Sequence, residues 1–160
     1  MAKLTHIDEK GRVRMVDVTP KKPTKRTAVA AGMISISPET FDAIQNQKVK
    51  KGNVLETARI AAIMAAKKTA ELIPMCHPLN ITHIQVDFSP DATKPCIGIE
   101  ATVRAIDQTG VEMEAITAVS IAALTIYDMC KAIDKEMTIS KIQLLKKTGG
   151  KSGSYVRKGK

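Results

Sequence analysis

The sequence predicts an α+β fold of the split βαβ, or ferredoxin-like, class, with an antiparallel sheet packed against two long helices. Short segments alternate apolar and polar residues with the period of half-buried strands, and two longer segments have the length of helices. Along the chain these elements follow the order β-α-β-β-α-β. No internal repeat or linker divides the 160 residues, so we expect a single domain over 1–160.

The first strand is expected at 33–36, where the sequence reads Met-Ile-Ser-Ile. A short helix should follow it. Ser37 is a favourable N-cap residue, Pro38 suits the first helical position, and Glu39 places a negative charge in the first turn. We expect this helix to end near Gln47.

The first long helix is predicted over 54–73, after the basic interruption at 48–52. Asn53 with Glu56 three residues later is a helix start signal of the capping-box kind. The helix should end before Pro74, because proline lacks the N–H that the next helical hydrogen bond needs.

The remaining strands follow from alternation. Residues 84–88 and 97–105 alternate apolar and polar side chains, and 90–95 should form the loop between them. Residues 107–110 read as a turn, and 138–145 have the pattern of the last strand.

The second long helix is unusually apolar. Residues 111–115 should lead into it, and it should end near Ile133. It contains no charged residue from Ala115 to Tyr127, and such a helix must be covered on every side. The alanine-rich stretch 58–66 of the first long helix has the same character. In a domain of this size, that much coverage indicates a subunit interface in addition to a sheet.

The net charge of +9 is concentrated at the two ends of the chain. Residues 1–30 carry eight basic and three acidic side chains, and residues 146–160 carry six basic and no acidic ones. The body, residues 31–145, therefore has a net charge of −2. The two basic arms are either solvated tails or segments that fold over a polyanionic ligand.

Composition excludes several classes. Trp is absent, and two Tyr and two Phe leave few stacking platforms for single-stranded nucleic acid. Three cysteines without close pairing indicate a reducing compartment. No segment approaches the roughly 18 to 20 apolar residues of a membrane span, so we expect a cytoplasmic protein without membrane contact. The Cys and His spacing matches no zinc motif, so we expect no metal site.

Asp128 and Lys131 are the most informative charged pair. They lie three residues apart on one helical face, directly after the uncharged stretch, so we expect them to be paired and partly buried. Burial raises the pKa of a carboxylate and lowers that of a lysine, whereas mutual attraction does the reverse, and this balance can tune both groups toward neutrality. The alternative is a structural ion pair at a helix end.

Two short motifs are candidates for ligand contacts. Lys51 precedes the positive N-terminus of a helix, where it forms either part of an anion site or a solvated surface charge. His77 lies in a loop held extended by Pro74 and Pro78, which suits contact with a substrate. Cys76 beside it points the opposite way in an extended loop, so the dipeptide is poor evidence for a Cys–His nucleophile.

Glu112 and Glu114 share one face if their segment is extended. They could accept hydrogen bonds from the ring N–H and amino group of a guanine-like ligand, or they could be solvated strand ends. Gly-Gly-Lys-Ser-Gly at 149–153 is similar to part of a phosphate-binding P-loop, but Leu145 stands where that motif needs glycine. This segment is therefore either an anion-wrapping loop or a flexible tail.

Four separated motifs together resemble the cyclic pyranopterin monophosphate synthase family, the C-type proteins of early molybdenum cofactor biosynthesis. The motifs are Pro74–Leu79, Gly110–Ala115, Thr125–Ala132 and Lys147–Gly153. The resemblance extends from Val16 to Gly153 and implies a ferredoxin-like subunit in a homohexamer, a trimer of dimers, with active sites at subunit interfaces. It implies the substrate 3′,8-cyclo-7,8-dihydroguanosine 5′-triphosphate, supplied by a radical enzyme, and the products cyclic pyranopterin monophosphate and pyrophosphate.

The resemblance also implies roles for individual residues. It places the catalytic aspartate at Asp128 and the essential lysines at Lys51 and Lys131. It implies substrate contacts at Met75, Cys76, His77, Glu112, Met113 and Glu114. The arms would supply triphosphate ligands, namely Arg26, Lys147, Lys151 and residues within 21–25. No resident cofactor is expected, although Mg²⁺ could accompany the triphosphate.

In the mechanism this implies, Glu112, Glu114 and His77 hold the base, while the two lysines exchange protons and Asp128 orients one of them. A sugar hydroxyl then attacks the α-phosphate. The competing class is a basic phosphate- or nucleic-acid-binding module without catalysis, which fits poorly with the few aromatic residues. A non-catalytic assembly subunit would leave the paired charges unexplained.

Overall fold

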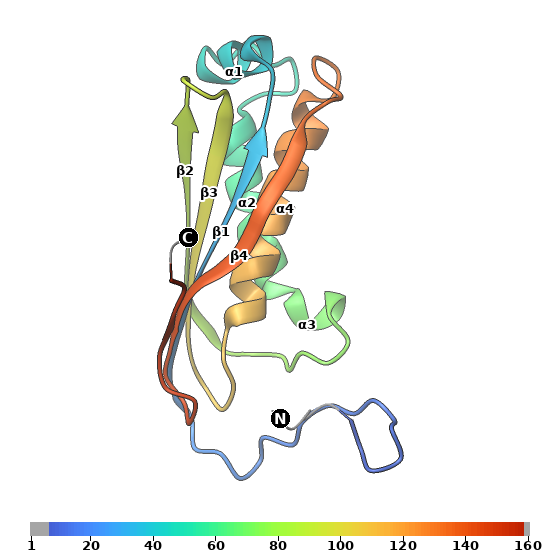
Figure 1. Ribbon diagram of the computed structural model, residues 1–160, viewed down its shortest axis with the longest axis vertical. Coiled ribbons are helices and arrows are strands. Elements are labelled where there is room, and N and C mark those ends of the chain that lie inside the picture. Colours follow the sequence, from blue (N-terminus) through green and yellow to red (C-terminus); the bar gives the residue numbers. More distant parts are fainter. Residues whose placement is uncertain (1–6, 159–160) are drawn as a thin grey trace.

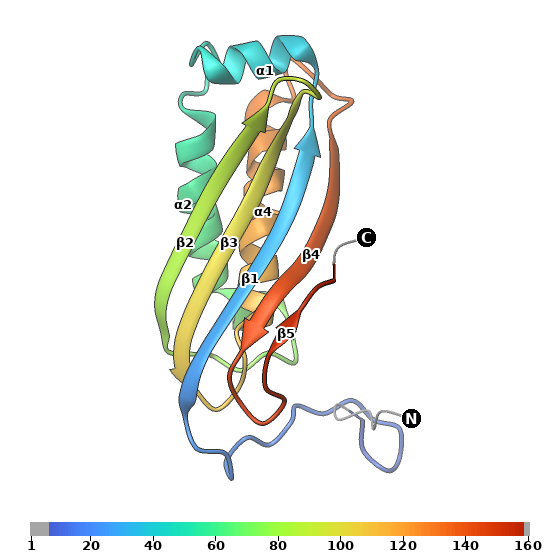
Figure 2. The same cartoon turned by 60° about the vertical axis from the view of Figure 1, so that its left-hand side comes forward.

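The computed structural model describes residues 7–158 and shows an α+β chain with one five-stranded antiparallel sheet (Figure 1). The strands are β1 (Thr24–Ser35), β2 (Ile81–Asp91), β3 (Cys96–Asp107), β4 (Thr138–Thr148) and β5 (Tyr155–Val156). The helices are α1 (Pro38–Gln45), α2 (Val54–Lys67), α3 (Thr69–Leu72) and α4 (Glu112–Cys130). The strand order is β2-β3-β1-β4-β5, and α2 and α4 cover one face (Figure 2). This arrangement confirms the α+β class and is compatible with the expected ferredoxin-like fold.

The central strand β1 begins at Thr24, nine residues before the predicted start, so 24–30 belong to the sheet and not to an arm. Its inward positions in this part, Ala28 and Ala30, are fully buried but too small to give a strong hydrophobic alternation. Gly32 also faces α4, where a Cβ would lie only 2.5 Å from Cγ1 of Val119. Small residues therefore let β1 approach the helix closely, and they hide the strand from pattern analysis.

The two helix starts are confirmed. The amide of Thr40 donates to Oγ of Ser37 over 3.1 Å, and the amide of Glu56 donates to Oδ1 of Asn53 over 3.1 Å. The long helix predicted over 54–73 is instead interrupted at Lys68, which separates α2 from α3. At the end of α2 the amide of Lys68 donates to the carbonyl of Ala65, and the hydroxyl of Thr69 donates to the carbonyls of Ala65 and Ala66.

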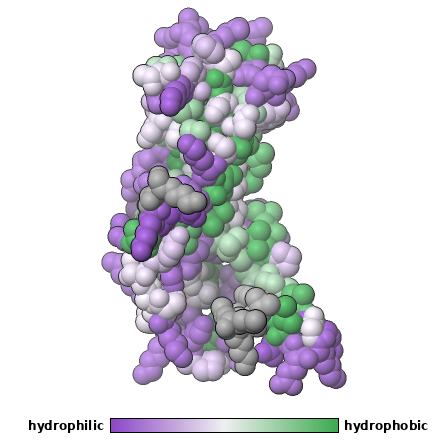
Figure 3. All heavy atoms as spheres, viewed as in Figure 1, coloured by the Kyte–Doolittle hydropathy of each residue, from purple (hydrophilic) through white to green (hydrophobic). Residues whose placement is uncertain are grey.

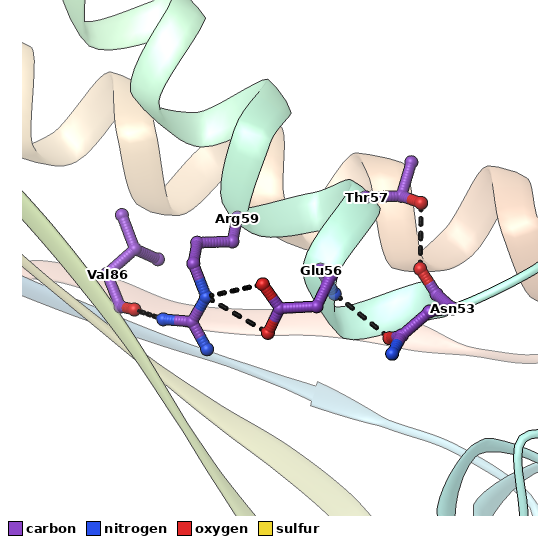
Figure 4. Close-up of polar contacts among 5 residues, drawn as sticks. All are labelled: Asn53, Glu56, Thr57, Arg59 and Val86. Carbon is purple, nitrogen blue, oxygen red and sulfur yellow. Dashed lines mark hydrogen bonds and ion pairs between the residues drawn. The ribbon is translucent and has the colours of Figure 1, made fainter.

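Arg59 ties α2 to the edge strand β2 (Figure 4). Its Nε lies 3.2 Å from both carboxylate oxygens of Glu56, and Nη1 donates to the carbonyl of Val86. The guanidinium also lies over the ring of Phe88, 5.2 Å from its centroid. The contact fixes the helix against the outermost strand and occupies one carbonyl of an otherwise open edge.

The strand pair β2 and β3 is longer than predicted. Pro90 pairs with Ile97, so the connecting loop is shorter than 90–95. An edge strand tolerates this proline because its missing N–H can face solvent. At the other end of the sheet, β4 extends to Thr148 and pairs with β5 through Lys146 and Lys147, so part of the predicted C-terminal arm is also strand.

Helix α4 is the core helix of the fold. By length and composition it could cross a membrane, but more than half of its most apolar stretch is buried. The expectation that it is covered on every side is not met within one chain, because Leu124 is 53% exposed. Ile60 and Met64 on α2 are also exposed, and Figure 3 shows apolar surface on the side where α4 lies in Figure 1.

Candidate active site

The predicted site residues lie in two clusters at opposite ends of α4. Lys51, Asp128 and Lys131 form the C-terminal cluster. Glu112 and Glu114 lie in the first turn of the helix and belong to the N-terminal cluster. Because an α-helix rises about 1.5 Å per residue, Glu114 and Asp128 are separated by about 21 Å.

The C-terminal cluster is a carboxylate held between two lysines. Nζ of Lys131 lies 2.7 Å from Oδ1 of Asp128, and Nζ of Lys51 lies 3.1 Å from Oδ2. Lys51 also donates to the main-chain carbonyl of Asp128 over 2.8 Å. The last carbonyls of a helix lack intrahelical partners and carry partial negative charge, so this end of α4 favours a cation. Lys51 comes from the loop between α1 and α2.

All three side chains are exposed, with exposed fractions of 45% for Lys51, 58% for Asp128 and 53% for Lys131. Hydrogen bonds from Lys131 and Lys51 hold the pKa of Asp128 below its usual value, and the bond to Asp128 raises the pKa of Lys131. The predicted pairing is confirmed. The predicted burial and the shift toward neutrality are wrong for a single chain, because water still solvates these charges and desolvation does not offset their attraction.

A cavity of about 540 Å³ lies at the N-terminal end of α4. All six substrate contacts that the resemblance implied line it: Met75, Cys76, His77, Glu112, Met113 and Glu114. The N-terminal segment closes another side with Val16, Val18 and Lys21. Residues that are separated by up to about a hundred positions in the sequence therefore meet in one place.

The two glutamates are presented by a helix, so the expectation of an extended segment with both on one face is wrong. Glu114 is only 3% exposed, whereas Glu112 is half-buried. Both nevertheless line the cavity. The positive end of the helix dipole favours acidic side chains in this first turn.

Burial is the main cause that raises the pKa of Glu114 to about 7, with the carboxylates of Glu112 and Asp107 adding to the shift and its own backbone amide opposing it. A carboxyl group with this pKa can donate or accept a proton near neutrality. Burial also raises the pKa of the Cys76 thiol, and Glu114 adds to that shift. The thiol is therefore poorly suited to act as a nucleophile, in agreement with the sequence analysis.

A second cavity of about 380 Å³ adjoins the first. The two share Lys21, Thr109, Gly110 and Glu112. The predicted triphosphate ligands Arg26, Lys147 and Lys151 line the second cavity. Nζ of Lys147 lies 4.0 Å from Oε1 of Glu112, at the junction with the carboxylate cavity. Basic residues from both ends of the chain thus gather around one cleft.

A comparison with family models matches residues 15–150 to the MoaC family. The chain belongs to the MoaC family. The matched range includes both ends of α4 and every predicted site residue except Lys151. The resemblance drawn from the sequence motifs is confirmed.

Curated proteins similar to this MoaC family chain are named cyclic pyranopterin monophosphate synthase. The protein of Desulfatibacillum aliphaticivorans is 62% identical over 99% of this chain and 100% of its own length. Those of Desulforapulum autotrophicum and Pelotomaculum thermopropionicum are 61% and 58% identical, over 98% and 99% of this chain and 96% and 94% of their own lengths.

The cavities of the MoaC family chain are also lined by residues to which the sequence analysis gave no role. Thr109 and Gly110 line both cavities, although Thr109 was predicted only as part of a turn and Gly110 as part of that turn and of the motif that follows it. Asp107 holds this turn, since its carboxylate accepts from the amides of Gln108, over 2.7 Å, and of Asn80, over 3.0 Å. The signal in the sequence that could have identified these residues was the position of the turn, which overlaps the start of the motif at 110–115.

Proposed function

We propose that this chain is a cyclic pyranopterin monophosphate synthase. It converts 3′,8-cyclo-7,8-dihydroguanosine 5′-triphosphate into cyclic pyranopterin monophosphate and pyrophosphate, an early step of molybdenum cofactor biosynthesis. The observation that carries the proposal is the continuity of the carboxylate-lined cavity with the basic one. A guanine-derived triphosphate offers hydrogen-bond donors to the first cavity and negative charge to the second.

Each part of the cleft has a proposed binding role. Glu112 and Glu114 accept hydrogen bonds from the ring and amino groups of the base, with His77 on the same cavity wall. Lys147 and Lys151 bind the phosphates, together with Lys21. These charge-assisted contacts need no aromatic stacking, which accounts for a basic protein with few aromatic residues.

We further propose that two copies of the chain complete one active site. General acid–base catalysis needs heavy atoms within about 2.6–3.2 Å, whereas Glu114 and Asp128 of one chain lie about 21 Å apart. A second copy must therefore place its Lys51–Asp128–Lys131 cluster beside the cavities of the first. The exposed apolar residues Leu124 and Ile60 support such contacts. The assembly proposed is a homohexamer, a trimer of dimers.

The chemistry then divides between the clusters. Lys131, kept protonated by Asp128, donates a proton to the substrate ring as it opens and recloses, and Lys51 exchanges protons beside it. A sugar hydroxyl attacks the α-phosphorus and a new P–O bond closes the cyclic phosphate. The bond from the α-phosphorus to the bridging oxygen breaks, the hydroxyl proton passes to a base, and pyrophosphate leaves with the bonding electrons. Lys147 stabilises the departing charge.

The proposed enzyme works in the cytoplasm and takes its substrate from a radical enzyme that cyclises GTP. No resident cofactor is proposed; any Mg²⁺ would arrive with the triphosphate.

The reaction is tested by supplying the cyclised GTP intermediate to the purified protein and measuring both products. Pyrophosphate and cyclic pyranopterin monophosphate should form in equal amounts. If neither forms while the protein binds duplex DNA with a steep loss of affinity between low and physiological salt, the proposal fails in favour of a phosphate-binding module.

A further inference from the structure

Arg26 stands out because it is only 9% exposed, which is unusual for an arginine. It lies near the start of β1, and two of its guanidinium nitrogens donate to main-chain carbonyls. Nε lies 3.2 Å from the carbonyl oxygen of Asp107, and Nη2 lies 3.0 Å from that of Gln108. The rigid fork of an arginine therefore holds the 107–110 turn, which lines both cavities.

The other side of the guanidinium is covered by the glycine pair of the C-terminal segment. A Cβ on Gly150 would lie only 1.6 Å from Nη1 of Arg26. A Cβ on Gly149 would lie 2.2 Å from the main-chain oxygen of Lys25. Both glycines also have positive φ, of 98° at Gly149 and 74° at Gly150. Gly150 is thus required for its backbone conformation and, separately, for the space that Arg26 fills.

We propose that Arg26 is a positioning residue that joins the 107–110 turn to the 147–152 segment, and so sets where Lys147 and Lys151 stand relative to the carboxylate cavity. The inference rests on the proposed function, in which this basic cavity holds the pyrophosphate end of the substrate. This positioning role differs from that of a charged side chain that only binds the phosphates. A lysine at position 26 would keep the charge but could not donate to both carbonyls while supporting the glycine pair.

The test is a double-mutant cycle of Arg26→Lys and Gly150→Ala in the assembled protein, with the dissociation constant of inorganic pyrophosphate measured by calorimetry. Each single substitution should weaken binding by about tenfold, the size of one lost hydrogen bond to a charged group. Because lysine leaves the space beside Gly150 free of the guanidinium, Gly150→Ala should cost less in the Arg26→Lys background, where only the strain of its positive φ remains. The same non-additivity should appear in kcat/KM for the cyclised substrate.

Gly153→Ala is the matched control for backbone strain in the same segment. Gly153 has a φ of 65°, and no described residue lies within 4 Å of its added Cβ. Its substitution should therefore weaken pyrophosphate binding less than Gly150→Ala does.

Three results would overturn the inference: additive losses of pyrophosphate affinity in the double variant, wild-type affinity in Arg26→Lys, and no pyrophosphate binding by the wild-type protein. If Gly150→Ala does not fold, Arg26→Lys decides alone. A failure of the proposed reaction gives a different result. If the two substitutions weaken pyrophosphate binding non-additively while the protein shows no turnover, the positioning role of Arg26 is retained and the proposed activity is rejected.

Discussion

The two ends of α4 surround their charged residues with opposite environments. At the N-terminal end, Glu114 is buried in a cavity and its pKa rises to about 7. At the C-terminal end, Asp128 and Lys131 are exposed, and their mutual attraction moves both pKa values away from neutrality. The N-terminal end is enclosed by other segments of the same chain, and the C-terminal end is exposed to solvent. We call them the enclosed end and the open end.

This difference supports the proposal that one chain completes only part of the site. The lining of the cavity at the N-terminal end comes from three segments of the same chain, residues 16–21, 73–79 and 109–114. The C-terminal end has charged groups at hydrogen-bond distance, but their side chains are about half exposed. A second copy that covers it would remove water, strengthen its electrostatic interactions and bring it to a substrate.

Removing the carboxylate of the open end should have the largest effect. Asp128→Ala should lower kcat by about a thousandfold, because Lys131 and Lys51 lose the group that orients them. The free energy of unfolding should change by less than about 0.5 kcal/mol, since the side chain is exposed in the single chain. Rates of pyrophosphate release and thermal unfolding of the variant measure these two effects.

Lys48→Ala is the matched control, because Lys48 lies in the same loop as Lys51 but pairs with Asp42, 3.5 Å away, in an ion pair that is at least as exposed. It should retain wild-type turnover. If Asp128→Ala also kept wild-type turnover, the open end would have no part in the mechanism.

A charge on the exposed face of α4 should separate the copies. Leu124→Glu would place an unpaired carboxylate in the proposed interface, at a cost of about 3 kcal/mol, or roughly a hundredfold in association. Sedimentation should show smaller species that keep their helical signal and lose turnover. A variant that remains fully assembled would show that this face of α4 lies outside the interface.

The enclosed end should make stability depend on pH. The pKa of Glu114 is about 7 in the folded protein and 4.5 for an ordinary solvated glutamate, so the folded protein binds the extra proton between these values. Its contribution is therefore favourable below about pH 4.5 and is lost as pH rises toward 7. Glu114→Gln should remove this dependence and stabilise the protein at pH 8 by about 3 kcal/mol. If the wild-type protein and Glu114→Gln had the same unfolding curves from pH 5 to pH 8, the burial of Glu114 would be contradicted.

The smallest effect is expected away from both ends. Arg59→Ala removes the link between α2 and β2 and should destabilise the fold by about 1 kcal/mol, without changing turnover. Denaturant unfolding and the pyrophosphate assay measure the two quantities. A large loss of turnover would show that the edge strand contributes to the site.

Pattern analysis located the elements of this fold better than their ends. The start of β1 was missed because its buried positions are alanines, and the break at Lys68 was missed because no glycine or proline marks it before Pro74. The motif residues around Cys76 and Glu114 were identified by resemblance, whereas their meeting in one cavity depends on tertiary packing. The burial of Arg26 was not predictable, because its partners are main-chain carbonyls 81 and 82 positions away.

The exposure of Asp128 was mispredicted for a related reason. The uncharged stretch before it indicated a covered helix, and burial of Asp128 was inferred from that cover although part of the cover was expected from a subunit interface. Sequence periodicity reports which faces need cover but does not distinguish cover by the same chain from cover by a second copy.

Mixing two inactive variants tests the shared site most directly. Asp128→Ala disables the open end, and His77→Ala alters the enclosed one. If two copies share each site, a hybrid dimer has one intact site, and an equal mixture reassembled at random should recover about a quarter of wild-type turnover. If both clusters serve one site within a single chain, the mixture should remain as inactive as either variant alone, which would contradict the account.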